Sequence, residues 1–228
     1  MKNALMAFRF LALGERSANI QPEFVGSGTL YFPVIGLIAG VCLAVLNRVL
    51  QSYLESEILA VVLVTFLILL TRAAHLAGTQ KAFTASNSAT EAGIYGLLAI
   101  FLIVLFKVRS IEVIGETRNL SLLLSPAFAR WSAVLFFYRS TSPADEFIQR
   151  IVENVSAWHL IIATAITLGV GIVLAGTTAL WIGLSVSLFA LLSRAYLRRR
   201  RVDISCSHFD ALVELSETLS LVLFASLY

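Results

Sequence analysis

Charged side chains are scarce in this sequence. Asp, Glu, Lys and Arg make up 14% of the 228 residues, whereas hydrophobic residues make up 58% and the mean hydropathy is +0.87. In a soluble domain roughly a quarter of all residues are charged, because water must solvate its surface. The few charges present cannot cover a water-exposed surface, which excludes a soluble fold and makes lipid the solvent for most of the chain.

Motifs of common soluble enzymes are also absent. The two cysteines, Cys42 and Cys206, form neither a disulfide framework nor the paired spacing of a metal site. The sequence has no P-loop, dinucleotide-binding glycine pattern, nucleophile elbow or zinc motif. The N-terminal residues lack a compact apolar core followed by small residues, so we expect no cleaved signal peptide. A net charge of +3 is too small to indicate a nucleic-acid partner.

Long apolar runs are what the sequence does contain. A membrane helix needs roughly 20 mostly apolar residues. The runs predict an all-α fold, a polytopic membrane helix bundle of six or seven transmembrane helices, in one domain over residues 1–228 with the lipid bilayer as partner. Residues 1–28 are predicted to be an N-terminal interfacial segment. The expected spans are Thr29–Asn47, Ile58–Thr71 extended to Leu76, Ala92–Phe106, Leu120–Tyr138, Trp158–Ala175, Leu180–Leu197 and Ala211–Tyr228.

Basic residues are distributed unevenly between the two sets of connecting segments. Lys and Arg concentrate in cytoplasmic segments of membrane proteins. This predicts a multi-pass protein of the cytoplasmic (inner) membrane with its N-terminus inside, and places residues 14–28, 78–91, 139–157 and 198–210 at the cytoplasmic face. The inner segments then hold twelve of the 17 basic residues, and the outer segments hold four, which are Arg48, Lys107, Arg109 and Arg118.

The last apolar run carries three carboxylates on one stripe. Asp210, Glu214 and Glu217 are spaced i, i+4 and i+7, so they lie within about 60° of one another on a helix. Acids in a membrane helix must face protein, water or a cation. One interpretation is that they pair with the arginine run and Arg194. A second is a Mg²⁺ site, because Mg²⁺ prefers oxygen ligands. A third is the preference of acids for the start of a helix.

Three further features are candidates for binding or chemistry. Arg130 lies within a predicted span and needs an internal partner, either a phosphate or one of the glutamates. His75 lies at the inner end of the second span, where a packed or interfacial role competes with a role as a ligand. The run Arg198–Arg201 is typical of a segment that contacts anionic lipid headgroups, with a phosphorylated substrate as the second alternative.

Six segments in order give the sequence a family resemblance. They are FRFLALGE from Phe8, YFPVIGLIAG from Tyr31, AAHLAG ending at Gly78, EAGIYGL from Glu91, ARWSAVLFFYR from Ala129 and ALVELSE from Ala211. In this order and spacing they resemble the cobalamin synthase family, the adenosylcobinamide-GDP ribazoletransferases, over nearly the whole chain.

The resemblance implies an activity and a set of site residues. The implied reaction joins α-ribazole or its phosphate to the GDP-activated corrinoid and expels GMP at the cytoplasmic face, with Mg²⁺ as cofactor. Phosphorylated corrinoid and ribazole substrates are then the expected partners. The matching positions imply catalytic roles for His75, Arg130, Glu214 and Glu217, and cofactor-binding roles for Gly78, Gly93, Gly96 and Arg139. Asp210, Glu214 and Glu217 are the expected metal ligands.

The sequence departs from the family pattern at its aspartates. Ala77 stands at the first aspartate of the family's H-L-D-G-x-x-D-x-x-D-G segment, and Thr79–Phe83 contains no acid. Ala89 and Glu91 replace an aspartate and an arginine, and Cys206–His208 replaces a G-D-T segment. Two alternatives to catalysis therefore stay open: an inactive membrane scaffold or corrinoid-binding subunit, and a small-molecule transporter.

Overall fold

The chain forms a bundle of α-helices in a computed structural model, which describes residues 2–12, 14–16, 19–84, 89–140 and 143–227. Within these residues there is no β-strand, and the all-α prediction is confirmed. A single turn of 3-10 helix, Thr29–Tyr31, precedes α3. The α-helices are α1 (Lys2–Ala12), α2 (Pro22–Ser27), α3 (Phe32–Leu50), α4 (Ser56–Leu70), α5 (Ala74–Thr84), α6 (Ala89–Val113), α7 (Arg118–Phe137), α8 (Glu146–Glu153), α9 (Ala157–Ala175), α10 (Thr177–Arg199) and α11 (Cys206–Leu227).

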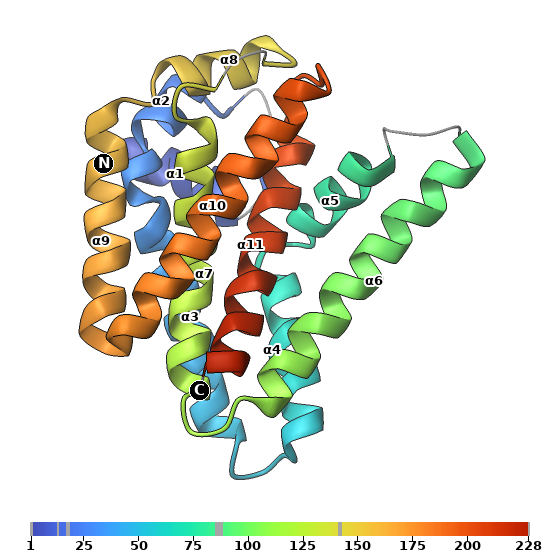
Figure 1. The fold of residues 1–228 in the computed structure, drawn as a ribbon, viewed down its shortest axis with the longest axis vertical. Coiled ribbons are helices and arrows are strands. Elements are labelled where there is room, and N and C mark those ends of the chain that lie inside the picture. The colour runs from blue at the N-terminus through green and yellow to red at the C-terminus, as the bar shows by residue number, and fades with distance from the viewer. Residues whose placement is uncertain (1, 13, 17–18, 85–88, 141–142, 228) are drawn as a thin grey trace.

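Several of these helices can cross a membrane. In the described part of the chain, α3 with its preceding turn, α6, α7, α9 and α10 are long and apolar enough to do so, and the bent pair α4 and α5 brings the total to six. The seventh predicted span corresponds to α11, which carries three acids and runs beside these helices along the length of the bundle (Figure 1). The chain is therefore built as a multi-pass membrane protein.

The second predicted span is shorter than the sequence indicated. We expected it to continue to Leu76, but α4 ends at Leu70 and α5 leaves it at 85°. Arg72 and Ala73 have φ angles of 50° and 56°, in the left-handed region. The amide of Ala73 donates to the carbonyl of Ile68 at 2.8 Å, a bond that closes a helix end. As a continuous helix the span therefore ends at Leu70, and it reaches Leu76 only across the bend into α5.

Two predicted connecting segments also contain helix. Residues 78–84 belong to α5 and residues 89–91 to α6, while 85–88 lie outside the described residues. Residues 107–113 form the end of α6 rather than an outer connection, because α6 continues to Val113. Lys107 is consequently a helical residue that is only 3% exposed, and its assignment to an outer segment is wrong.

Helix α7 forms the centre of the bundle and packs closely against α3. Nearly all its side chains from Ser121 onward are buried. Two glycines of α3 permit the close approach of the two backbones, because a Cβ at Gly36 would lie 2.5 Å from the carbonyl oxygen of Pro126 and one at Gly40 would meet the backbone of Leu123. Phe209 of α11 packs in the core against Phe10 of α1 and Phe137 of α7, with ring centroids 5.2 and 5.1 Å apart.

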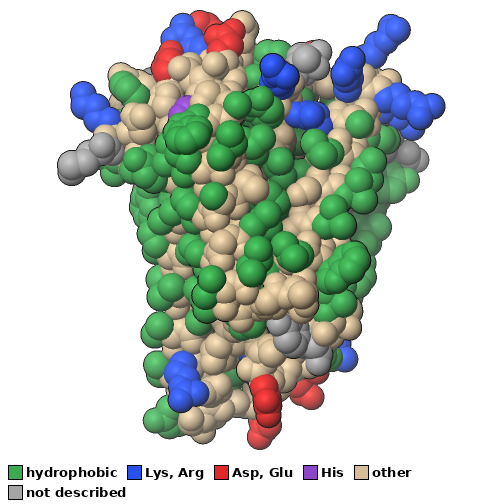
Figure 2. Space-filling model, turned by 60° about the vertical axis from the view of Figure 1, so that its left-hand side comes forward, with side chains coloured by type: hydrophobic (Ala, Val, Ile, Leu, Met, Phe, Trp, Pro, Cys, Tyr) green, Lys and Arg blue, Asp and Glu red, His purple; other side chains and the backbone are tan. Residues whose placement is uncertain are grey.

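The outer surface has the character of a protein in a bilayer. Large apolar side chains such as Phe101, Val173 and Trp181 are 62%, 83% and 62% exposed. Figure 2 shows an apolar band over one flank, with basic and acidic side chains above it and a few charges at the opposite end. The helices α1, α2 and α8 and the connection from α10 to α11 share the upper end in Figure 1. Three of the four predicted inner segments, 14–28, 139–157 and 198–210, thus meet at one end as far as they are described, and which side of the membrane this end faces stays a prediction.

Candidate functional site

Helix α11 separates two kinds of environment. One of its faces carries Asp210, Glu214 and Glu217, all buried, while the opposite face carries His208 and Leu212 beside a cleft. Residues at i, i+4 and i+7 share one helical face, and those at 208 and 212 lie on the other side of the axis. The acids predicted to form one site therefore face the packed interior of the bundle.

Asp210 is bound by two basic side chains, and we call Arg16, His75 and Asp210 the Asp210 group. The guanidinium of Arg16 donates to both carboxylate oxygens of Asp210 at 2.5 Å. Nδ1 of His75 lies 2.8 Å from Oδ1 of Asp210, and its Nε2 lies 2.9 Å from the carbonyl oxygen of Leu11. Through these two contacts the ring of His75 bridges Asp210 of α11 and the end of α1.

Gly78 explains how α5 and α11 approach so closely at this point. A Cβ at residue 78 would lie 2.5 Å from Cγ of Asp210 and closer still to Oδ2. Only a residue without a side chain leaves space for the carboxylate against the helix backbone. Gly78 and His75, both predicted site residues, therefore lie together at the Asp210 group.

A second set of charges lies one to two turns further along α11, and we call Lys107, Arg130, Glu214 and Glu217 the Lys107 group. Nζ of Lys107 donates to Oε2 of Glu214 at 2.6 Å and to Oε1 of Glu217 at 2.7 Å. The guanidinium of Arg130 donates to Oε2 of Glu217 at 3.0 Å and to the carbonyl of Pro126 at 3.0 Å. Two cations face two carboxylates, so the formal charges of the group cancel.

The structure decides between the interpretations of these charges. Arg130 contacts Glu217, which is the second of the two partners considered for it. The acids do not pair with the arginine run or with Arg194, and that expectation is wrong. Instead they pair with Arg16, Lys107 and Arg130. The guanidinium of Arg194 donates to the backbone carbonyl of Tyr138 at 2.5 Å.

The carboxylates expected to bind Mg²⁺ are divided between the two groups. Among the described residues, no three His, Cys, Asp or Glu side chains are arranged to hold a metal ion. Each of Asp210, Glu214 and Glu217 already contacts a cationic side chain within 3.0 Å. A metal ion would have to displace these cations, so the residues present do not fit a resident Mg²⁺ ion. Binding of Mg²⁺ stays a prediction that rests on the family resemblance.

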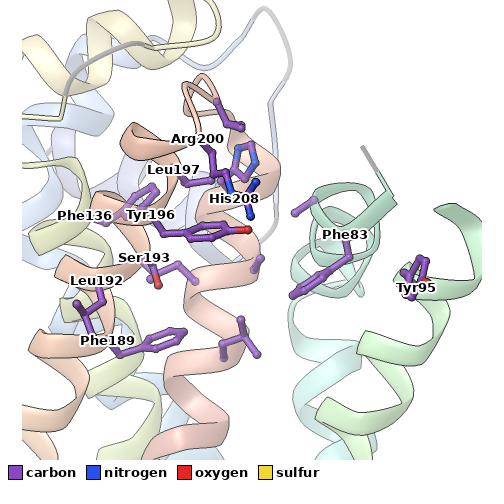
Figure 3. Close-up of a pocket in the computed structure, with 15 residues that line it drawn as sticks. Phe83, Tyr95, Phe136, Phe189, Leu192, Ser193, Tyr196, Leu197, Arg200 and His208 are labelled. Atoms are coloured by element: carbon purple, nitrogen blue, oxygen red, sulfur yellow. The ribbon is translucent and has the colours of Figure 1, made fainter. Parts of the chain in front are cut away.

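The opposite face of α11 borders a cleft of about 790 Å³ between α5 and α6 on one side and α10 and α11 on the other (Figure 3). Apolar and aromatic side chains dominate its lining. Phe83 and Tyr95 stand on the side of α5 and α6, facing Phe189 and Tyr196 across the opening (Figure 3). A cleft of this size and character suits a drug-sized or larger amphipathic molecule.

Polar groups occupy one end of this cleft. Arg200 lies there with its guanidinium 5.6 Å from the ring of Tyr196, and His208 lies beside it (Figure 3). Burial lowers the pKa of His208, so its ring is neutral at pH 7. Nδ1 of His208 is 2.9 Å from the hydroxyl of Ser205. Arg200 is therefore the cation that the cleft can offer to an anionic group of a ligand.

The remaining predicted binding residues are dispersed. Gly96 packs against α5, where a Cβ would lie 2.8 Å from the carbonyl of Gln80, whereas nothing lies within 4 Å of a Cβ at Gly93. Arg139 lies at a separate hollow with Arg194 on the far flank of α10. The structure thus does not gather the predicted binding residues around one ligand site.

Sequence reasoning missed two members of the charged groups. Lys107 was read as part of a loop, although it follows the apolar run IFLIVLF without a turn residue. A lysine that continues an apolar helix points to a buried partner, and this signal was available. Arg16 lies in an irregular segment, and no pattern in the sequence connects it to Asp210, 194 positions away.

Comparisons with known proteins agree with one another. The profile of a family described as cobalamin-5-phosphate synthase matches residues 3–225. A protein of Syntrophobacter fumaroxidans is 32% identical over 163 residues, 65% of this chain and 66% of that protein. One of Geotalea daltonii is 25% identical over 232 residues, 95% of this chain and 94% of that protein. One of Alkaliphilus metalliredigens is 30% identical over 64% of both chains.

All three relatives carry the name adenosylcobinamide-GDP ribazoletransferase. The matched regions of the first and third span slightly less than two thirds of those proteins, while the second match is nearly complete. No solved structure matches the chain.

Proposed function

Because this chain belongs to the cobalamin-5-phosphate synthase family, we propose that it binds a corrinoid precursor in the cleft between α5, α6, α10 and α11 and acts on it in cobalamin biosynthesis. The reaction implied by its relatives transfers the adenosylcobinamide moiety to ribazole. In that reaction a ribose hydroxyl of α-ribazole, or of α-ribazole phosphate, loses its proton and its oxygen bonds to the phosphorus attached to the corrinoid. The bond between this phosphorus and the oxygen that bridges it to the second phosphorus breaks, and GMP leaves with the bridging oxygen.

The cleft is the observation on which this proposal rests. Its volume of about 790 Å³ and its aromatic lining suit the broad, largely apolar ring of a corrinoid. The rings of Phe83, Tyr95, Phe189 and Tyr196 come from both sides of the opening (Figure 3), so a flat ligand between them would be contacted on two faces.

Arg200 is suited to the charged end of such a ligand. It is exposed at the polar end of the cleft, and its guanidinium lies over the ring of Tyr196. A guanidinium can bind a phosphate through two parallel hydrogen bonds. We therefore assign Arg200 to the phosphate that links the corrinoid to its activating nucleotide, and the aromatic residues to the ring itself.

The pairing of the carboxylates in the two charged groups favours a protein that binds the corrinoid over one that catalyses the transfer. Mg²⁺ would neutralise phosphate oxygens in such a transfer, but the carboxylates here are paired with Arg16, Lys107 and Arg130. We assign no step to the metal. This pairing favours a second candidate function, a corrinoid-binding subunit without transferase activity. A transporter would be expected to contain broken helices near the middle of the membrane. Pro126 does not break α7, and the bend between α4 and α5 is the one such break among the described residues.

Corrinoid binding and transfer can be tested separately. Equilibrium dialysis of the purified protein in detergent against cobinamide, read by the visible absorbance of the corrin, measures binding. We expect saturable binding that Tyr196→Ala weakens about tenfold, the equivalent of about 1.4 kcal/mol. Trp181→Ala is the matched control, since Trp181 is an exposed aromatic residue of the same helix outside the cleft.

Complementation of cells that lack the ribazoletransferase distinguishes the two candidates. If the unmodified chain rescues growth and Arg200→Gln rescues it less well, the result supports the transferase. Binding without rescue, from a protein that inserts normally in the membrane, supports the corrinoid-binding subunit. Absence of saturable cobinamide binding, or equal weakening by Tyr196→Ala and Trp181→Ala, would overturn the assignment of the cleft.

A further inference from the structure

Four arginines surround a second hollow on the other flank of α10. It encloses about 460 Å³ and is lined by Arg139, Arg194, Arg198 and Arg199 together with Leu191 and Ala195. The residues of α10 that line the aromatic cleft, such as Phe189, Leu192 and Tyr196, belong to a different set. The hollow is therefore separate from the cleft proposed to hold the corrinoid.

The fold holds two of these arginines in position. Arg194 donates to the carbonyl of Tyr138 at 2.5 Å and to that of Leu135 at 3.4 Å, which ties α10 to the end of α7. Arg139 follows α7 directly with a φ of 53°, and its guanidinium lies 5.7 Å from the ring of Tyr138. Arg198 follows Arg194 by one helical turn, so it lies on the same flank of α10.

The described residues supply no ion pair to offset this concentration of charge. Among the described residues, none of the four arginines forms an ion pair with an Asp or Glu side chain. Four guanidinium groups around one hollow repel each other, and an anion bound between them would offset this repulsion. Arginine also matches the geometry of phosphate oxygens through bidentate hydrogen bonds. We propose that this hollow is a phosphate-binding site.

The surroundings identify two sources of such a phosphate. The hollow lies at the end of α10, and basic side chains gather at this end of the bundle above an apolar flank (Figure 2). Leu188 and Leu191, on the turns just below, are 54% and 43% exposed. This arrangement suits an anionic lipid whose headgroup binds the arginines while its chains cover the leucines. The other source is a phosphate of a water-soluble nucleotide.

The proposal can be tested by ligand-dependent thermal stability of the full chain in detergent. The probes are phosphatidylglycerol, phosphatidylcholine, inorganic phosphate and GMP, and the readout is the concentration that gives half of the maximal rise in Tm. We expect phosphatidylglycerol to stabilise the protein and phosphatidylcholine to have no effect. In Arg198→Gln/Arg199→Gln the concentration required should increase about tenfold or more, because two of the four guanidinium groups are removed.

A variant with the same loss of charge provides the control. Arg72→Gln/Arg201→Gln removes two exposed arginines that do not line the hollow, and its response should equal that of the unmodified chain. If GMP or inorganic phosphate stabilises the protein and the lipid does not, with the same dependence on Arg198 and Arg199, the site takes a soluble phosphate. Equal effects of the two double variants, or no stabilisation by any probe, would refute a phosphate site. Neither result depends on corrinoid binding.

Discussion

Replacing Lys107 by methionine tests whether the polar interior is held together by charge balance. The substitution keeps the length of the side chain and removes its ammonium group, which lies 2.6 Å from Glu214 and 2.7 Å from Glu217. Arg130 still contacts Glu217, so the group would retain two carboxylates and one cation. Glu214 would lose the cation that contacts it in an interior where Lys107 is only 3% exposed.

The expected loss of stability is large for a single substitution. Removing one partner from a buried ion pair costs about 3–5 kcal/mol, because a charge without compensation stays buried. The remaining contact of Arg130 places the cost near the lower end, at about 3 kcal/mol. For a chain of this size 1 kcal/mol corresponds to about 2–4 °C in Tm, which predicts a decrease of about 6–12 °C.

A second substitution separates charge balance from packing. Lys107→Met/Glu214→Gln leaves Glu217 and Arg130, one charge of each sign, so we expect its Tm to exceed that of Lys107→Met. The measurement is thermal unfolding of the purified variants in one detergent at one scan rate. Lys81→Met is the control, because Lys81 is exposed and should tolerate the change. A Tm of Lys107→Met equal to that of the unmodified chain, or a double variant no more stable than Lys107→Met, would contradict the reasoning.

Three further predictions concern the Asp210 group, a nearby thiol and the metal. Gly78→Ala should lower Tm by several degrees because its methyl group would collide with Asp210, whereas Gly93→Ala meets open space and should not, as parallel melting curves will show. Burial raises the pKa of Cys206 to about 11, so in a Cys42→Ser background maleimide labelling should accelerate about tenfold per pH unit from pH 7 to 10; a plateau near pH 9 would contradict this. MgCl₂ and EDTA should leave Tm unchanged in the absence of substrate, and a rise with micromolar Mg²⁺ would show that a metal site forms.

The long spans could be predicted closely from the sequence. Leu120–Tyr138 was expected where α7 occupies Arg118–Phe137, and Trp158–Ala175 was expected where α9 occupies Ala157–Ala175. These segments are apolar runs bounded by polar or charged residues, so both ends are marked locally. Hydropathy alone determines such a boundary because the cost of placing charged groups in lipid is large.

The break after α4 and the length of α6 could not be predicted in the same way. Leu76 continues the apolar composition of the second span, and the left-handed backbone at Arg72 and Ala73 has no signal such as glycine or proline. In α6, Lys107 and Arg109 resemble the charges that mark a membrane boundary. The burial of Lys107 depends on α11, which lies more than 100 residues away in the chain, whereas Arg109 pairs with Glu112 of α6 itself.

Of the candidate site, the sequence identified the acids but not their partners. The spacing of Asp210, Glu214 and Glu217 correctly indicated inward-facing carboxylates. Which cation each acid contacts depends on how α5, α6 and α7 pack against α11, and this information is tertiary. The spacing also suggested one shared site, because it does not show that Arg16 enters between the helices and binds Asp210.

The charged groups bind neighbouring helices to α11, which gives them a role that requires no chemistry. His75 connects α5 to α11, Lys107 connects α6 and Arg130 connects α7, each through a carboxylate of α11. Ion pairs that are satisfied within the protein need neither a metal nor a substrate to stay buried. The bundle and its cleft can therefore persist in a family member that lacks the aspartates expected at Ala77 and in the segment after Gly78. Retention of the fold therefore does not show that transferase activity is retained. An assay that measures the ribazole product separately from corrinoid binding is needed to distinguish an enzyme from a binding subunit.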